Sequence, residues 1–415
     1  MKIGIVGLGY VGLPLGVAFA EEGHEVVGVD VDQRKVTMLR GGDSYIEDVA
    51  SERLLGAGER LHFSQRYADL AACEAVVVAV PTPLTRNREP DLGPLVSAGT
   101  ALASVLQQGQ LVVLESTTYP GTTSERLAPL LEESGLAAGR DFNLAFSPER
   151  IDPGRTDYTL RNTPKVVGGL TPACCERAIA LYEHVCDEVV EVSSTEAAEL
   201  TKLLENVFRS VNIALVNELA MLCDRMDIDV WEVVEAANTK PYGFMSFKPG
   251  PGMGGHCLPV DPFYLAWRAR EFDTPTEFIE LAGEVNQAMP YFCEEKIAHA
   301  LNDHQKSVKG SRIAILGVSY KPGVGDMRES PSIKIMRLLA ERGAELVYHD
   351  EHVPELPDFG LSSESLTAAL EGADCAAILT AHPGLDIEAL VAGAPLVVDF
   401  RGVTRGIEAP HLVRL

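Results

Sequence analysis

The sequence predicts an α/β protein with two doubly wound parallel sheets joined by a long central helix. Short apolar runs alternate with helical stretches, which is typical of parallel sheets buried on both faces. A weak internal echo, IGIVGLGYVG at 3–12 and IAILGVSYKPG at 313–323, indicates two related units. Between them, residues 196–226 have a helical pattern without glycine or proline, as expected of a connecting helix.

The first unit starts with a strand at 2–6 that enters a glycine-rich turn, followed by a helix over 13–22 with Gly23 near its C-cap. The next strand, HEVVGVD, ends in Asp30 about twenty residues past the glycines. Further buried strands are expected at 75–80, 111–114 and 142–146. Each runs into polar residues, and strand ends of this kind bind ligands in doubly wound sheets.

The last third of the sequence repeats this alternation. A second helical stretch is expected at 277–302, and a fresh α/β unit starts with the strand at 312–316. Its later elements, one helix and three strands, are expected at 331–342, 345–349, 374–379 and 396–399. A chain of 415 residues is long enough for two or three domains, and we place boundaries near residues 195 and 305.

Gly7, Gly9 and Gly12 have the spacing of a dinucleotide-binding fingerprint. Gly7 permits a tight turn, and Gly9 lets the backbone approach a pyrophosphate at the helix N-terminus. Asp30 can accept hydrogen bonds from ribose hydroxyls and would repel a 2′-phosphate, so NAD is favoured over NADP. A purely structural glycine turn is the alternative, but the two flanking strands and the acid argue against it.

The first twenty residues also resemble an export signal, because Lys2 precedes eighteen uncharged residues that end in Ala18-Phe19-Ala20. The second strand and its terminal acid follow in register, which favours a cofactor site instead. Eight scattered cysteines without a CxxC pair indicate reduced thiols and a cytoplasmic location. The net charge of −25 argues against nucleic-acid or membrane partners. No metal site is expected, and His349, Asp350 and His352 are expected in a solvated loop.

Lys202 and Asn206 lie one turn apart in the long helical stretch and therefore face the same side. Such a pair beside a nicotinamide suits alcohol oxidation, because it can hold the hydroxyl, relay its proton and stabilise an oxyanion. The alternative is a pair of solvated side chains on an exposed helix face.

Residues 248–262, KPGPGMGGHCLPVDP, suit neither a helix nor a strand. They are expected to form a loop whose N–H groups face a ligand and which presents Cys257 at a turn. Cys257 would be a thiol nucleophile, with Asp261 four residues further on. A small buried hydrophobic side chain is the alternative interpretation of this cysteine.

Three cations of the last region, Lys321, Arg328 and Arg401, could bind a diphosphate in this acidic protein. Surface salt bridging explains the same residues equally well from their spacing alone.

Together these segments resemble the UDP-glucose/GDP-mannose dehydrogenase family along essentially the whole chain. The motifs that carry the resemblance are the glycine fingerprint, VPTP at 80–83, ESTTYPGTT at 115–123, SPER at 147–150, AELTKLLEN at 198–206, GPGMGGHC at 250–257 and the YKP and DMRESP segments after 319. All of them follow one another in the order of the family.

The resemblance implies two Rossmann-like doubly wound domains joined by a long central helix that also forms a homodimer. It implies an NAD-binding domain at 1–195, a central helical region with the catalytic loop at 196–304 and a nucleotide-sugar-binding domain at 305–415. The implied reaction oxidises a hexose C6 alcohol of a nucleotide-diphosphate sugar to a carboxylate with two NAD⁺. A thiohemiacetal and a thioester on Cys257 would be its covalent intermediates.

Carried over by position, the resemblance also implies the site residues. The catalytic set is Cys257, Lys202, Asn206, Asp261, Glu149 and Thr117. The NAD contacts are Gly7, Gly9, Tyr10, Val11, Gly12, Asp30, Pro81, Thr82, Thr117 and Arg328. The substrate contacts are Arg150, Lys202, Asn206, Lys248, Gly250, Gly254, Lys321 and Arg401.

Two departures from the glucose-type members bear on the sugar. Their cysteine loop commonly reads GGSCFPKD, whereas this chain has GGHCLPVD, with His256 and Val260 at changed positions. Pro153 stands where those members carry a second Glu, which leaves Glu149 to handle the water. Together with DPFYL after the loop, these changes are similar to the branch that acts on UDP-N-acetylhexosamines, and UDP-N-acetylglucosamine is favoured. UDP- or TDP-glucose and UDP-N-acetylmannosamine are alternatives.

Two other classes of protein share part of the pattern. A two-electron dehydrogenase of the β-hydroxyacid type has the glycine fingerprint and a Lys-x3-Asn helix, but it needs neither Cys257 nor a second α/β unit with diphosphate ligands. An inactive protein that binds NAD or a sugar nucleotide would not need the set of Lys202, Asn206, Cys257 and Asp261.

Overall fold

The computed structural model describes residues 1–415 except 47–48, 86–88, 152–156 and 256–257. The chain divides into two compact units. The first unit comprises Met1–Glu205 and Phe263–Pro275, and the second comprises Asn206–Pro262 and Thr276–Leu415. Each unit is built on its own β-sheet.

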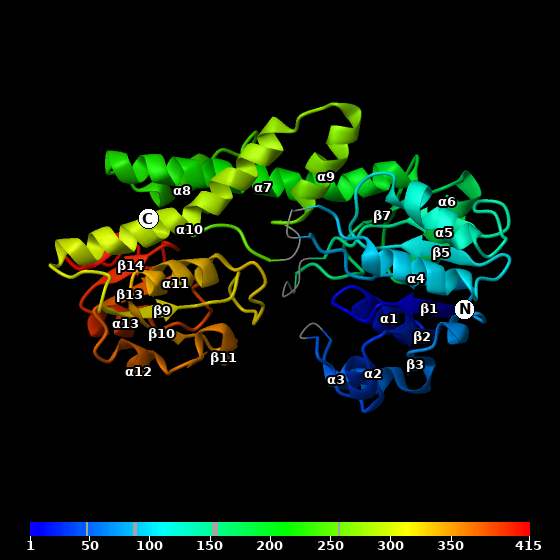
Figure 1. Ribbon diagram of the computed structural model, residues 1–415, viewed down its shortest axis with the longest axis horizontal. Helices are drawn as coiled ribbons and strands as arrows, with labels where there is room; N and C mark the ends of the chain where they lie inside the picture. Colours follow the sequence, from blue (N-terminus) through cyan, green and yellow to red (C-terminus); the bar gives the residue numbers. More distant parts are fainter. Residues whose placement is uncertain (47–48, 86–88, 152–156, 256–257) are drawn as a thin grey trace. The chain divides into compact units, whose positions relative to one another are not determined.

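The first unit contains an eight-stranded sheet in the order β3-β2-β1-β4-β5-β6-β7-β8 (Figure 1). Its strands are β1 (Lys2–Val6), β2 (Glu25–Val29), β3 (Leu61–Ser64), β4 (Ala75–Val78), β5 (Leu111–Leu114), β6 (Asn143–Phe146), β7 (Lys165–Gly169) and β8 (Val189–Val192). Neighbouring strands are parallel except for β6 and β7, which are antiparallel. The predicted parallel sheet is therefore confirmed with one reversed step.

Helices cover both faces of this sheet, as the uninterrupted apolar strands require. One face packs against α1 (Gly12–Glu21), α3 (Ser51–Ala57) and α6 (Pro172–Tyr182). The other face packs against α4 (Gly93–Ala103) and α5 (Ala128–Glu132). The alternation within β1 shows the principle, since Ile3 and Ile5 enter the first cluster and Val6 enters the second. Helix α2 (Gln33–Arg40) is capped at its N-terminus by Asp32, whose carboxylate accepts the N–H of Arg34.

Helix α7 (Thr195–Met226) is the long central helix that the sequence predicts, and it runs from the first unit into the second. It is followed by α8 (Val230–Asn238), α9 (Asp261–Ala269) and α10 (Glu277–Asp303). Most of α9 belongs to the first unit, whereas α8 and α10 belong to the second.

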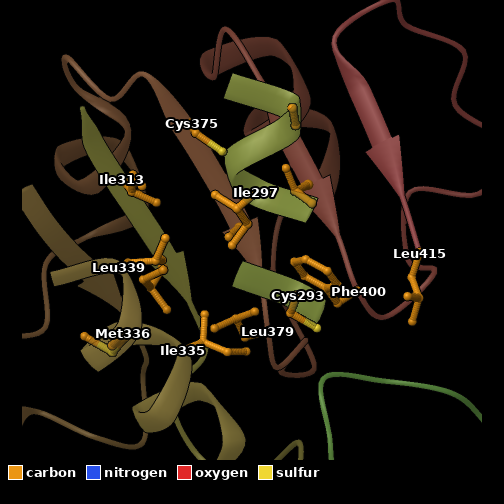
Figure 2. Packing of buried hydrophobic residues seen from close by; sticks show 14 of the residues in the cluster. Cys293, Ile297, Ile313, Ile335, Met336, Leu339, Cys375, Leu379, Phe400 and Leu415 are labelled. Carbon is orange, nitrogen blue, oxygen red and sulfur yellow. The ribbon is translucent and has the colours of Figure 1, made fainter. Parts of the chain in front are cut away.

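The second unit contains a five-stranded parallel sheet in the order β10-β9-β13-β14-β15. Its strands are β9 (Arg312–Leu316), β10 (Glu345–His349), β13 (Cys375–Ile378), β14 (Val397–Asp399) and β15 (Leu412–Arg414). One face packs against α10 and α11 (Pro331–Glu341), and the other packs against α12 (Leu366–Leu370) and α13 (Ile387–Gly393). Figure 2 shows Cys293 and Ile297 of α10 within the first of these clusters. A small hairpin, β11 (Glu355–Leu356) and β12 (Leu361–Ser362), lies outside this sheet.

Among the helices that the structure describes, none has both the length and the apolar character needed to cross a membrane. The uncharged opening stretch consists instead of the buried strand β1 and the helix α1, whose apolar residues pack on the sheet.

Candidate functional site

The glycine-rich turn after β1 has a backbone that only glycine adopts without strain at its first position. Gly7 has φ of +92°, and a Cβ added there would lie 2.4 Å from the carbonyl oxygen of Ala79. A Cβ added to Gly12 would lie 1.9 Å from the carbonyl oxygen of Gly7. A Cβ added to Gly9 would meet no atom of the described residues within 4 Å, so this part of the chain leaves the turn open at that point. The open cradle at the start of α1 fits a pyrophosphate.

Asp30 lies at the end of β2 beside this turn, as predicted. Its Oδ2 accepts the N–H of Leu8 at 2.9 Å, and its Oδ1 accepts the N–H of Asp32 at 2.9 Å. Lys35 Nζ lies 3.5 Å from Oδ2. A carboxylate offers about four lone pairs, so Asp30 retains capacity for ribose hydroxyls. The turn and the acid together fit NAD. Tyr10 is exposed and Val11 is half-buried at the mouth of the turn.

The loops after β4 and β5 are tied together by the predicted cofactor residues. The hydroxyl of buried Thr82 donates to the carbonyl oxygen of Thr117 at 2.6 Å, and Pro81 beside it is exposed. Tyr264 of α9, which is fully buried, donates to the carbonyl oxygens of Thr82 and Pro83. Tyr264 thus anchors the helix that follows the cysteine loop onto the strand ends of the first unit. Nothing in the sequence indicates this role beyond an aromatic residue in an apolar run.

Glu149, predicted to handle the water, lies in a buried charge cluster that the sequence did not reveal. Lys165, the first residue of β7, places its Nζ 3.4 Å from Glu149 Oε2 and 3.1 Å from Glu115 Oε1. Tyr182 of α6 donates its hydroxyl to the same Glu115 oxygen. Burial raises the pKa of Glu115 and outweighs the opposite effect of Lys165.

Both oxygens of the Glu149 carboxylate have partners that favour its ionised form. Its Oε1 accepts the N–H groups of Arg150 at 2.8 Å and Ile151 at 2.6 Å. Burial would raise the pKa of Glu149, but Lys165 and the Ile151 N–H outweigh burial and hold this pKa below its usual range. Lys202 of α7 acts in the same direction, which shows that it lies near Glu149.

Arg150, predicted to bind substrate, has internal partners in the first unit. Its guanidinium lies 2.6 Å from Glu205 Oε1 and donates to the carbonyl oxygen of Pro164 at 2.6 Å. A substrate group that binds Arg150 would therefore share this guanidinium with Glu205.

Glu199 of α7, which lies within the motif AELTKLLEN, is a buried carboxyl. Its two oxygens accept the N–H groups of Gly121 at 2.6 Å and Thr123 at 2.9 Å, and the Thr123 hydroxyl at 2.7 Å. Burial raises the pKa of Glu199 to about 7. The residue ties α7 to the π-helical turn Thr122–Leu127, which follows the loop that carries Thr117.

The alternative interpretation of Lys202 and Asn206 as solvated surface residues is wrong. They are only 9% and 5% exposed. Asn206 donates from Nδ2 to Asp261 Oδ2 at 2.5 Å, and Asp261 at the start of α9 is 1% exposed. The structure thus brings Asn206 and Asp261 together, while Cys257 and His256 lie outside the described residues.

The glycine loop before Cys257 is held by two buried amides of the second unit. Asn217 of α7 accepts the N–H of Gly250 at 3.0 Å on its Oδ1 and donates to Asn286 Oδ1 of α10 at 3.0 Å. Asn286 in turn donates to the carbonyl oxygen of Ser210 at 3.2 Å. The sequence did not identify this clamp. The signal that it offered was an amide at an otherwise apolar position in each of two long helices.

The other end of the loop contacts the segment that carries Arg328. Gly255 donates its N–H to the carbonyl oxygen of Arg328 at 2.9 Å, and the backbone at Gly254 lies against the Tyr320 side chain. The Arg328 guanidinium is bound by Asp326, with Nη2 and Oδ2 2.6 Å apart. Surface ion pairing, the alternative interpretation, therefore applies to Arg328.

The remaining predicted substrate residues differ in burial. Arg401 donates from Nε to the carbonyl oxygen of Leu379 at 2.6 Å, and its guanidinium lies against Gly250. Burial lowers the pKa of Arg401 to about 10. Lys321 is half-buried, with Nζ 5.9 Å from the centre of the Tyr320 ring, and Lys248 is exposed.

The expectation that Asp350 lies in a solvated loop is wrong. Asp350 is 2% exposed, and its Oδ2 lies 3.0 Å from Nε2 of buried His382. The Nδ1 of His382 accepts the N–H of Gly323 at 3.1 Å, so the proton sits on Nε2 and is donated to Asp350. The partner that buries Asp350 is 32 residues away in sequence.

Comparison with known families covers nearly the whole chain. Residues 1–186 match the NAD binding domain of the UDP-glucose/GDP-mannose dehydrogenase family. Residues 196–288 match its central domain, and residues 314–406 match its UDP binding domain. The NAD-binding domain that the glycine turn predicts is therefore present.

Individual relatives agree with this assignment. The chain is 39% identical over 356 residues to the UDP-N-acetyl-D-glucosamine 6-dehydrogenase of Pseudomonas aeruginosa, covering 85% of this chain and 83% of the relative. It is 34% identical over 429 residues to the UDP-N-acetyl-D-mannosamine dehydrogenase of Pyrococcus horikoshii, covering 98% and 100%. The solved structure of the UDP-ManNAc dehydrogenase from Pyrococcus horikoshii superposes with a TM-score of 0.92 at 33% identity, covering 100% of this chain and 99% of the other.

Proposed function

The chain belongs to the UDP-glucose/GDP-mannose dehydrogenase family and is an NAD-dependent nucleotide-sugar dehydrogenase, and we propose that it oxidises the C6 alcohol of UDP-N-acetylglucosamine to the uronic acid. The observation that carries this choice of sugar is the 39% identity to a UDP-N-acetyl-D-glucosamine 6-dehydrogenase. The loop GGHCLPVD and Pro153, which depart from glucose-type members, support it.

UDP-N-acetylmannosamine is a second candidate on a specific observation. A relative with that printed activity aligns over 98% of this chain, although at the lower identity of 34%. The two sugars differ only in configuration at C2, so the contacts around the acetamido group would decide between them.

The first unit contains the proposed cofactor site. NAD⁺, when bound, accepts the hydride that leaves C6 in each of two oxidations. The open backbone at Gly9 receives the pyrophosphate, and Asp30 binds the ribose hydroxyls. The bonded pair of Thr82 and Thr117 fixes the strand-end loops beside that cradle.

Buried polar groups on α7 and α9 orient the sugar alcohol in this proposal. Lys202 and Asn206 hold the C6 oxygen and stabilise the negative charge that develops on it when its proton leaves. Asp261 fixes the Asn206 amide through their 2.5 Å hydrogen bond, so that the second N–H of this amide has a defined direction for donation to the C6 oxygen. Burial of all three strengthens these interactions, because water does not compete with them.

Cys257 retains the intermediate covalently. Its thiolate adds to the aldehyde carbon to give a thiohemiacetal, and loss of a second hydride and a proton leaves a thioester. Glu149 then takes a proton from the attacking water. The C–S bond breaks, the sulfur leaves as thiolate, and the carboxylic acid is released.

A panel assay with NAD⁺ tests the proposed substrate. UDP-GlcNAc, UDP-ManNAc, UDP-glucose, TDP-glucose and GDP-mannose are supplied in turn, and NADH and product mass are followed. We expect the highest kcat/KM with UDP-GlcNAc and two NADH per sugar. One NADH per sugar would refute the thioester route in favour of a two-electron dehydrogenase, and binding without NAD⁺ reduction would indicate an inactive binding protein.

Cys257→Ser tests the nucleophile in the same assay. We expect carboxylate formation to fall by at least about 10³-fold, because serine lacks a comparably nucleophilic anion at neutral pH. Cys293→Ser is the matched control, since this buried cysteine of α10 lies in the apolar core of the second unit. Carboxylate release by Cys257→Ser at the wild-type rate would exclude the assigned role.

The proposed enzyme is a homodimer formed through α7. Phe208, Leu215, Leu219, Leu222 and Met226 are each between 42% and 57% exposed, and their spacing is that of a coiled-coil seam. A second copy of the same helix matches such a seam. We expect Leu219→Asp with Leu222→Asp to convert a sedimenting dimer into a monomer, whereas Glu218→Lys does not. A wild-type chain that sediments as a monomer at micromolar concentration would contradict the proposal.

A further inference from the structure

A buried cluster of one lysine and two glutamates lies at the strand ends of the first unit, and only one of its members has a role in the proposed reaction. Lys165 is 3% exposed and Glu115, which follows β5, is 1% exposed. Lys165 Nζ lies 3.1 Å from Glu115 Oε1 and 3.4 Å from Glu149 Oε2. The single cation therefore bridges the proposed water-handling carboxyl and a second, deeper carboxyl.

Glu149 and Glu115 differ in how many of their carboxyl oxygens have a hydrogen-bond or ionic partner. Both oxygens of Glu149 have partners, namely two backbone N–H groups on Oε1 and Lys165 on Oε2. Glu115 receives Lys165 and the Tyr182 hydroxyl on Oε1, but its Oε2 is buried without a hydrogen-bond partner among the described residues. An anion with a bare buried oxygen is costly, whereas a protonated carboxyl at this place carries no charge.

Charge balance leads to the same assignment. Two ionised carboxylates and one ammonium would bury a net negative charge, and a single proton cancels it. Among the described residues, the other titratable groups that face the cluster are Tyr182 and Cys186 near Glu115 and Lys165, and Lys202 near Glu149. Lys202 lies on the Glu149 side, so it favours the ionised form there rather than at Glu115.

We propose that Glu115, Lys165 and Glu149 form a neutral trio that holds one proton on Glu115, so that Lys165 keeps Glu149 ionised to receive the proton of the attacking water. The proposal rests on the proposed function, which assigns the water step to Glu149. Lys165 and Glu115 are positioning residues, because they act on the substrate through Glu149. The opposite directions of the carboxyl pKa values, raised in Glu115 and lowered in Glu149, agree with this division.

The protonation state is tested without turnover. Infrared spectra of the wild type and Glu115→Gln at pH 7, in H₂O and D₂O, are compared in the carbonyl region of protonated carboxyls. We expect a deuterium-sensitive band in the wild type that is missing from the variant. The same spectrum in both proteins would overturn the assignment of the proton to Glu115.

Lys165→Met tests the link to Glu149. Without the cation both carboxyls remain neutral by holding protons, so we expect kcat at pH 7 to fall by about 10²-fold or more, with KM for NAD⁺ unchanged. The acid limb of the kcat profile moves upward by at least one pH unit, because Glu149 then ionises only at higher pH. A folded Lys165→Met that keeps the wild-type acid limb would overturn the proposal.

Two further variants separate positioning from general destabilisation. Lys165→Arg retains a cation, and we expect it to recover kcat to within about tenfold of the wild type with an unmoved acid limb. Lys306→Met removes a lysine from the surface pair with Asp374 and is expected to change neither quantity. If Lys165→Met does not fold, Lys165→Arg and the infrared comparison still test the proposal. An acid limb of the kcat profile that moves to higher pH in Lys165→Arg would contradict it. Failure of the proposed function itself appears separately, as one NADH per sugar in the wild type.

Discussion

The two sheets of the molecule begin with the same backbone turn, and they differ in what fills it. Gly7 after β1 and Gly317 after β9 have φ of +92° and +79°. At the next position but one, the first unit has Gly9 with open space around it, whereas the second has Ser319, which is fully buried. In the first unit the turn leaves open space at Gly9, and we call this turn the cradle. In the second unit the buried Ser319 stands at the corresponding position, and we call this turn the filled corner.

The acids at the ends of the second strands differ in the same way. Asp30 accepts two backbone N–H groups and is approached by Lys35. Asp350 accepts the N–H groups of four residues and also His382, so its carboxylate has no capacity left for a ribose. A similar strand and turn therefore begin a dinucleotide site in one unit and a closed structural turn in the other. The two differ because side chains from elsewhere in the chain, such as His382, occupy the acid of the second unit.

Replacing the open glycine has the largest expected effect on binding. Gly9→Val places its Cβ more than 4 Å from every atom of the part of the chain that the structure describes, so we expect an unchanged free energy of unfolding but at least a 100-fold loss of NAD affinity, about 2.7 kcal/mol. Titration calorimetry and urea denaturation measure the two quantities. Ser319→Gly is the matched change in the second unit. If this variant bound a second NAD, the proposed difference between the two turns would be contradicted.

Replacing the positive-φ glycine of the second unit has the largest expected effect on stability. In Gly317→Ala the added Cβ would lie 2.0 Å from the carbonyl oxygen of Thr380, and φ of +79° adds strain. We expect a loss of about 3 kcal/mol in the free energy of unfolding, measured by urea denaturation. Gly323→Ala has a similar φ but open space, and it should lose less. Equal losses would show that crowding at Gly317 is unimportant.

Neutralising the two strand-end acids should separate binding from stability. Asp350→Asn disturbs five accepted hydrogen bonds, and we expect a loss of about 2–3 kcal/mol in stability with NAD affinity unchanged. Asp30→Asn should lose only about 1 kcal/mol in stability but about tenfold in NAD affinity. Urea denaturation and titration calorimetry again measure the two quantities, and a reversed pattern would contradict the assignment of the open turn to the first unit.

The two units should also respond to pH in opposite directions, by at most about 1.4 kcal/mol per pH unit for a single group. Burial raises the pKa of Glu199 from 4.5 to about 7, so the folded state of the first unit binds more protons and loses stability as pH rises through that window.

For Asp350, burial is outweighed by His382 and the Val318 N–H, and its pKa lies below the ordinary 3.8. Ionised Asp350 therefore stabilises the folded second unit above pH 3.8, and this stabilisation is lost as the pH falls through the pKa that Asp350 has in the folded state. Hydrogen exchange followed by peptide resolves the two units, with pH 5 and pH 8 spanning the Glu199 window and a further measurement below the ordinary 3.8 of Asp350 reaching the second unit. In Glu199→Gln the decline of the first unit with rising pH should flatten, and an unchanged decline would show that another group causes it.

The sequence was most informative where a motif is local. The strand, glycine turn, helix and Asp30 are recognisable because they all lie within about thirty consecutive residues, and the structure has them close to the predicted places. The bounds of α7 differ by one residue from the predicted 196–226, because an uninterrupted helical pattern is equally local. Strand ends were less accurate, and the predicted 75–80 ends at Val78 in the structure.

The sequence by itself determined the α/β alternation, the NAD turn and the order of the family motifs, because each depends on spacing along one stretch of chain. Only the tertiary structure decided which polar residues are buried and what they meet. Lys165 meets Glu115 across 50 residues, Asn217 meets Asn286 across 69, and His382 closes the corner of Asp350 across 32. Such pairs leave no periodic signal, since a buried polar group is stable only when a distant part of the chain brings its partner.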